Sequence, residues 1–128
     1  MGKKRILLVE DEESLLRLES ILLSAKGYQV RGVMDGKSAL EEICADKPDL
    51  VLLDIMLPLV DGFEVCQYIK QNPETRAIPV VLLTARKNGQ DYARAMEVGA
   101  DAYITKPFKS AHVVETIEGL LARGENGN

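Results

Sequence analysis

Two uninterrupted apolar runs, Leu50–Leu53 and Pro79–Leu83, constrain the fold of this chain more than any other feature. Short runs of this kind, bounded by polar or turn-forming residues, are typical of β-strands that are buried on both faces. Such strands occur in parallel sheets whose two faces are covered by helices. Pro79 fits this interpretation because the first position of a strand tolerates proline. The two runs therefore predict the centre of a parallel sheet.

Three further strands are predicted. Each of the five predicted strands is followed by a segment with helical periodicity. The further strands are Ile6–Val9, Tyr28–Arg31 and Ala102–Ile104. We expect Tyr28–Arg31 at an edge of the sheet, because its apolar and polar residues alternate. Five strands that alternate with five helices predict an α/β fold with an open, doubly wound parallel sheet.

The helices are indicated by apolar residues at the helical period and by residues that suit helix ends. The first helix is marked by Leu15, Leu18, Leu22 and Ala25, with Gly27 in the place of a left-handed cap. Asp61 is predicted to cap the third helix, with Glu64 completing a capping box. The pattern ends with the fifth helix, so we expect one domain over residues 1–122 and a polar C-terminal tail over residues 123–128.

The composition excludes several classes of protein. Of the 128 residues, 46% are hydrophobic and 28% are charged, which excludes a disordered chain and a fibre. No apolar run approaches the roughly 20 residues that a membrane span needs, so we expect a cytoplasmic protein without membrane contact. The formal net charge of −4 argues against extensive direct contact with nucleic acid. Cys44 and Cys66 are too few for a metal site or a disulfide framework, and we expect both to be small buried side chains.

Chemically active residues follow four of the five predicted strands. Glu10 and Asp11 follow the first strand, Asp54 the third, Thr84 the fourth and Lys106 the fifth. Doubly wound sheets bind ligands beyond the carboxyl ends of their strands, so these side chains are expected to meet. Clustered carboxylates repel one another, and a hard divalent cation such as Mg²⁺ removes that repulsion. A carboxylate beside this ion can act as a nucleophile toward phosphorus, with a lysine and a hydroxyl to hold the phosphoryl oxygens.

Four motifs then resemble the receiver domain of bacterial two-component response regulators, including the chemotaxis regulator. The motifs are Leu7–Glu12, Leu53–Pro58 with Asp61-Gly62, Leu83–Ala85 and Thr105–Phe108. They occur in the order found in that family, each follows a predicted strand, and the likeness reaches to about Leu121. The resemblance implies the flavodoxin-like receiver fold with strand order 2-1-3-4-5.

The resemblance also implies a role for each site residue. Asp54 would accept a phosphoryl group from the phosphohistidine of a partner. Asp11, Asp54 and the backbone carbonyl of Met56 would bind Mg²⁺, with Mn²⁺ as an alternative ion, and Glu10 would hold a metal-bound water. Lys106 would pair with the phosphoryl oxygens.

Three further positions complete the likeness. In relatives the peptide bond between Lys106 and Pro107 is cis, which could aim the lysine inward. Thr84 would donate its hydroxyl to the phosphoryl group. Tyr103 resembles an aromatic switch residue that turns inward when Thr84 moves, although an aromatic side chain in a strand is also common as core packing.

The function implied is a phosphorylation-dependent signalling switch of a two-component phosphorelay. It is a binding module rather than an enzyme, and it catalyses its own phosphorylation and slow dephosphorylation. The expected partners are a histidine kinase or phosphotransfer protein and a downstream protein on the face of the fourth helix, fifth strand and fifth helix. Asp101 is followed by Ala102, where DNA-binding relatives often have a second acid, so we expect a monomer or weak dimer. A stand-alone regulator and one domain of a longer protein both fit the sequence.

Other functions fit the residues less well. An aspartate-nucleophile phosphatase would need a second acid at the position of Met56, and a P-loop enzyme would need glycines where Glu10-Asp11-Glu12 stand. A metal-free docking module is disfavoured by the complete set of acids, threonine and lysine. Met56 offers no side-chain hydrogen bond to align a water, and Arg86 is expected to cover the site. We therefore expect the phosphorylated form to live for minutes or longer.

Overall fold

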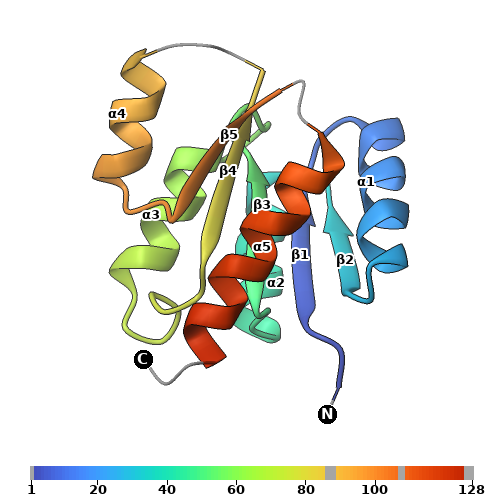
Figure 1. Cartoon of the computed structure of the whole chain (residues 1–128). Coiled ribbons are helices and arrows are strands. Elements are labelled where there is room, and N and C mark those ends of the chain that lie inside the picture. The colour runs from blue at the N-terminus through green and yellow to red at the C-terminus, as the bar shows by residue number, and fades with distance from the viewer. Residues whose placement is uncertain (1, 86–88, 107–108, 126–128) are drawn as a thin grey trace.

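The computed structural model describes residues 2–85, 89–106 and 109–125, and it contains one parallel sheet (Figure 1). Its strands are β1 (Arg5–Val9), β2 (Gln29–Val33), β3 (Leu50–Asp54), β4 (Val80–Thr84) and β5 (Ala102–Thr105). The strand order is β2-β1-β3-β4-β5, and all four neighbouring pairs are parallel. The predicted doubly wound α/β fold with the order 2-1-3-4-5 is confirmed.

Five helices cover the two faces of this sheet. They are α1 (Glu13–Ala25), α2 (Gly36–Ala45), α3 (Gly62–Gln71), α4 (Gly89–Glu97) and α5 (Ser110–Glu125). Buried residues of α2, α3 and α4 pack with one face of the sheet, and buried residues of α1 and α5 pack with the other. None of the described helices is long and apolar enough to cross a lipid bilayer. Cys66 on α3 is buried as predicted, but the prediction for Cys44 is wrong, because this residue of α2 is exposed and lies beside the hydroxyl of Tyr68.

The central strands have the burial that their apolar runs predict. Every residue of β3 and β4 is buried, whereas β2 at the sheet edge is largely exposed. The predicted strand at Tyr28–Arg31 is displaced by the end of α1. The Tyr28 backbone N–H donates to the carbonyl of Leu23, and Gly27 has a φ of 99°, so both residues belong to the turn that closes the helix.

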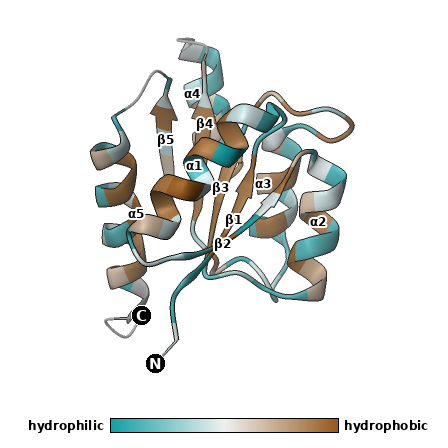
Figure 2. Ribbon diagram, turned by 90° about the vertical axis from the view of Figure 1, so that its right-hand side faces the viewer, coloured by the Kyte–Doolittle hydropathy of each residue, from teal (hydrophilic) through white to brown (hydrophobic). Residues whose placement is uncertain are grey.

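Helix α1 is confirmed, but the apolar stripe that predicts it faces solvent. Leu18 is 52% exposed and Leu22 is 40% exposed, whereas Leu23 and Glu19 are buried and Leu16 packs against the core. Residues 16, 19 and 23 form a second stripe at the same helical period. Glu19 interrupts that stripe. The leucine pattern alone therefore does not indicate which side of the helix is buried. In Figure 2, α1 lies in front of the sheet, and brown hydrophobic residues are visible along it.

Helix α5 continues to Glu125, into the segment 123–128 that the sequence assigns to a polar tail. Leu120 is buried and Leu121 packs against the core, which holds the helix to the sheet up to this point. The guanidinium of Arg123 lies 3.8 Å from the carboxylate of Asp101, and this contact supports one more turn. Residues 126–128 lie outside the described part of the chain.

Candidate functional site

Three carboxylates meet at the carboxyl ends of β1 and β3. Glu10 and Asp11 follow β1, and Asp54 is the last residue of β3. The two strands are hydrogen-bonded neighbours in which Val9 pairs with Leu53, so their ends lie side by side. One oxygen of each carboxylate lies within 4.8 Å of the other two. Glu10 and Asp54 are buried and Asp11 is exposed, so the cluster opens to solvent on one side.

Lys106 brings a cation to this cluster from the end of β5. Its Nζ donates to Oε1 of Glu10 at 2.8 Å and to Oδ2 of Asp54 at 2.8 Å. The Lys106 backbone N–H donates to the carbonyl of Thr84 at 2.7 Å, which anchors the start of the loop to β4. Strand β4 therefore lies between β5, which precedes Lys106, and β3, which ends at Asp54. The lysine side chain is long enough to reach across β4.

Thr84 ends the strand next to that of Asp54, and Met56 contacts the Asp54 carboxylate. Thr84 is fully buried at the end of β4, and the backbone N–H of Ile55 donates to the carbonyl of Leu83 next to it. The Met56 backbone N–H donates to Oδ1 of Asp54 at 3.0 Å, and the Met56 side chain is 54% exposed. The main chain of Met56 is thus held close to Asp54, while its side chain makes no polar contribution to the site.

The loop between β3 and α3 is shaped by a close approach of backbone atoms. A Cβ on Gly62 would lie 2.4 Å from the carbonyl oxygen of Asp54 and 2.6 Å from the Cα of Ile55. Only glycine fits this contact, which brings the start of α3 against the end of β3. The predicted capping box is present, because the Glu64 N–H donates to Asp61 Oδ1 and the Asp61 N–H donates to Glu64 Oε1.

Asp11 does not act as the cap of α1. Glu12 occupies the N-cap position, and no side-chain hydrogen bond caps this helix end. The Glu12 backbone N–H donates instead to Oε2 of Glu10 at 3.3 Å. A purely structural capping role for Asp11 is therefore not supported, and Asp11 is exposed at the edge of the cluster.

Burial and charge oppose each other within the cluster. Burial raises the pKa of Glu10, the hydrogen bond from Lys106 lowers it, and the nearby charge of Asp54 raises it further. Burial lowers the pKa of Lys106, but its bonds to Asp54 and Glu10 outweigh this effect, so the net shift is upward. The lysine is therefore a permanent cation at neutral pH.

Tyr103 lies on β5 and packs against the core cluster on the α2–α3–α4 face. Its ring meets that of Tyr92 on α4 edge to face, with centroids 5.4 Å apart and an interplanar angle of 88°. Sequence reasoning did not single out Tyr92, since an exposed tyrosine on a helix gives no signal. Pro107 with its predicted cis bond, Phe108 and Arg86 lie outside the described residues.

The donor set suits a hard divalent cation. Octahedral Mg²⁺ places its ligand oxygens about 2.9 to 4.2 Å apart. The three carboxylate oxygens all lie within 4.8 Å of one another, which is close to that range. All the donors are oxygens, and one carboxylate is exposed, which leaves room for the water ligands that Mg²⁺ retains. The predicted residues Glu10, Asp11 and Asp54 therefore fit such an ion.

Comparison with known proteins gives a consistent result. Residues 6–118 match the family model described as the response regulator receiver domain. The chain is 41% identical over 122 residues to the alkaline phosphatase synthesis transcriptional regulatory protein PhoP of Bacillus subtilis, covering 95% of this chain and 50% of that protein. It is 42% identical to the response regulator PleD of Caulobacter vibrioides, covering 91% of this chain and 26% of that protein. The chain thus spans half or less of the length of these relatives.

Solved structures agree with this match. A CheY-like response regulator receiver domain protein from Methanospirillum hungatei superposes with a TM-score of 0.92 at 27% identity, covering 99% of this chain and 100% of that chain. The receiver domain of a signal transduction histidine kinase from Syntrophus aciditrophicus gives a TM-score of 0.88 at 35% identity, covering 93% and 90% of the two chains.

Proposed function

This chain belongs to the family of response regulator receiver domains, the phosphorylation-dependent signalling modules of two-component systems, and on this basis we propose that Asp54 accepts the phosphoryl group. One observation carries the proposal: acids from β1, a cation from the end of β5 and a backbone N–H from Met56 all converge on the Asp54 carboxylate. Glu10 also receives Lys106 and a backbone N–H, that of Glu12, so the choice of Asp54 as acceptor rests further on its place in the Leu53–Pro58 motif of this family.

The acid cluster is the proposed site of Mg²⁺, with Mn²⁺ as an alternative ion. Asp11, Asp54 and the backbone carbonyl of Met56 would hold the ion, and Glu10 would hold one of its water ligands. When bound, the ion supplies positive charge for the phosphoryl oxygens and removes the repulsion among the carboxylates.

The residues of the chain then carry out the transfer. An oxygen of Asp54 attacks the phosphorus of a phosphohistidine, a new P–O bond forms, and the electron pair of the broken P–N bond returns to the imidazole. Lys106 already lies 2.8 Å from Asp54, so its ammonium can follow the oxygens of the arriving group. Thr84 would donate its hydroxyl to one of these oxygens, and Tyr103 would turn inward with it.

The chain is a signalling domain rather than an enzyme with a separate substrate. We propose that it catalyses its own phosphorylation and a slow loss of the phosphoryl group. The exposed Met56 side chain cannot hydrogen-bond a water in line with the acyl phosphate. The phosphorylated form is therefore expected to persist for minutes or longer.

The proposed phosphodonor is a histidine kinase or phosphotransfer protein, the partner class of this family. We propose the face of α4, β5 and α5 as the surface read by a downstream protein, and a monomer or weak dimer as the assembly. Some relatives are named as transcriptional regulators, and two are named as DNA-binding. The absence of direct nucleic acid contact is therefore proposed only for residues 1–128, together with a cytoplasmic location.

The proposal is tested by intact-protein mass after treatment with acetyl phosphate, with and without Mg²⁺. We expect a gain of one phosphoryl group only in the presence of the metal, and no gain for Asp54→Asn. Asp46→Asn is the matched control, because this exposed aspartate on the opposite end of the sheet pairs with Arg5. Labelling that persists in Asp54→Asn would place the acceptor elsewhere.

A further inference from the structure

Glu19 is a buried acid that the proposed chemistry does not use. It lies in the middle of α1 and is only 8% exposed. Its surroundings are the apolar seam between α1 and α5, where it lies beside Leu22, Leu23 and Leu52 and the valines of α5. A glutamate is rarely buried in such a place, because desolvating a carboxylate is costly unless the carboxylate is paired.

The Glu19 carboxylate is not fully satisfied. Its Oε1 is buried and has no hydrogen-bond partner among the described residues. A buried polar atom without a partner lowers the free energy of unfolding, so packing alone does not account for this residue. A leucine at the same position would continue the buried stripe of Leu16 and Leu23 without this penalty.

A groove is shared by Glu19 and Lys106, the lysine that contacts the acid cluster. It has a volume of about 500 Å³ and is lined by Glu19, by the leucines of α1 and by Ala85, Lys106 and Ser110. Glu19 and Lys106 therefore border the same space. The ammonium of Lys106 also donates to Glu10 and Asp54, so Lys106 links the groove beside Glu19 to the acid cluster.

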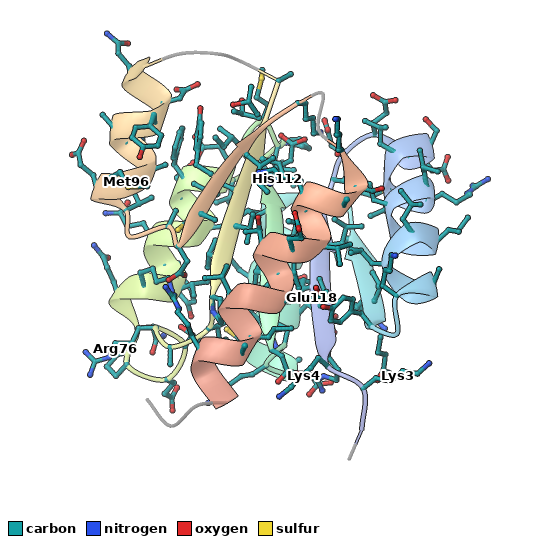
Figure 3. The ribbon with its side chains drawn as sticks, viewed as in Figure 1. Lys3, Lys4, Arg76, Met96, His112 and Glu118 are labelled. Atoms are coloured by element: carbon teal, nitrogen blue, oxygen red, sulfur yellow. The ribbon has the colours of Figure 1, made fainter. Side chains whose placement is uncertain are left out.

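The charged groups that act on Glu19 come from four parts of the chain. They are Glu10 after β1, Asp54 at the end of β3, Lys106 after β5 and Glu12 before α1. The α5 side of the seam contributes Ser110, Val113 and Val114, whereas His112 and Glu118 lie on the exposed side of this helix (Figure 3). The electrostatic surroundings of Glu19 are thus dominated by the site at the end of the sheet.

We propose that Glu19 is a positioning residue whose loss of a proton is coupled to the binding of a divalent cation by Glu10, Asp11 and Asp54. The proposal rests on the metal site proposed above. Glu19 does not ligate the ion. Its charge acts across the groove on Lys106 and on the acids that hold the ion.

The coupling follows from the balance of charges. Burial, followed by the negative charges of Glu10 and Asp54, raises the pKa of Glu19 to about 7, while the charge of Lys106 opposes this rise. A divalent cation cancels the repulsion from the acids and favours the ionised form of Glu19. By reciprocity, the ionised form of Glu19 raises the affinity of the site for the cation by the same factor.

The test combines calorimetry and NMR on the whole chain. Mg²⁺ affinity is measured by titration calorimetry at about pH 6 and about pH 8. We expect the increase in affinity from the lower to the higher pH to be about fivefold larger in the wild-type protein than in Glu19→Gln. Glu13→Gln is the matched control, because Glu13 lies on the exposed side of the same helix. The ¹³C shift of the Glu19 carboxyl is followed through a pH titration, and its midpoint is expected to fall when Mg²⁺ is added.

The outcomes separate this inference from the proposed function. If Mg²⁺ binds but the Glu19 midpoint does not move, and Glu19→Gln keeps the wild-type pH dependence, the inference is wrong and the metal site stands. If Mg²⁺ does not bind at any pH, both proposals are wrong. The NMR measurement uses the wild-type protein and is independent of whether a variant folds.

Discussion

At the scale of single residues, the site depends on a few positions where one residue type is required. Gly62 is one of them, because an added Cβ would meet two backbone groups, at Asp54 and Ile55, and neither can turn away as a side chain can. The backbone that presents Asp54 would have to move instead. The geometry of the acid cluster is thus set partly by a residue that has no side chain.

We predict that Gly62→Ala lowers the free energy of unfolding by about 2 kcal/mol or more, because overpacking against backbone is relieved only by backbone displacement. Acetyl phosphate labelling should also fall. Gly119→Ala on α5 is the control, since nothing lies within 4 Å of its added Cβ. That change should be neutral or stabilising by about 0.5 to 1 kcal/mol. Urea denaturation measures both, and an equal effect of the two substitutions would contradict the account.

The residues of the cluster could be predicted from the sequence, because their position after each strand depends only on strand ends and strand order. Glu10, Asp11, Asp54 and Lys106 meet as expected. Glu19 could not be found in this way. Its burial depends on which of two overlapping stripes of α1 faces the core, and that choice is made by packing against the sheet and α5.

At the scale of elements, the start of α3 links the fold to the site. The capping box of Asp61 and Glu64 fixes the first turn of α3 immediately after the loop that holds Met56. We predict that Asp61→Ala lowers the free energy of unfolding by about 1 kcal/mol, since the first-turn N–H groups lose an acceptor. Asp61→Asn keeps an acceptor oxygen and should cost clearly less. Chemical denaturation of the two variants measures the difference, and equal losses would rule out a capping role.

The elements themselves differ in how well the sequence predicts them. The apolar runs at β3 and β4 are confirmed because a strand buried on both faces leaves an unbroken pattern. The edge strand β2 is shifted because Tyr28 closes the preceding helix, and α5 is longer than expected because a polar last turn resembles a tail. The ends of β2 and α5 are decided by interactions with other elements. A local sequence pattern carries no information about those interactions.

At the scale of the whole molecule, Glu19 should make the stability depend on pH. Its pKa is raised from 4.5 in its ordinary state to about 7 in the folded protein. Between these two pH values the folded state therefore binds more protons than the unfolded state. The contribution of Glu19 to the free energy of unfolding is complete below the lower value and is lost as the pH rises to the upper one.

We predict that Glu19→Gln removes this loss and makes the folded protein more stable than the wild type at neutral and higher pH by about 2 kcal/mol, after allowance for solvent screening at the groove. The difference should shrink as the pH falls toward about 4.5. Denaturation curves of the two proteins without metal, collected across this range, measure it. A difference that does not vary with pH would show that Glu19 does not titrate in this window.

The most direct test of the account is to locate the phosphoryl group on the chain. After reaction with acetyl phosphate and Mg²⁺, borohydride converts an aspartyl phosphate to homoserine, and tandem mass spectrometry of the peptides identifies the position. We predict conversion at Asp54 alone, and only when the metal is present. Conversion at Glu10 or Asp11, or equal conversion at Asp54 without metal, would contradict the proposal that the strand ends form a metal-dependent phosphoacceptor site.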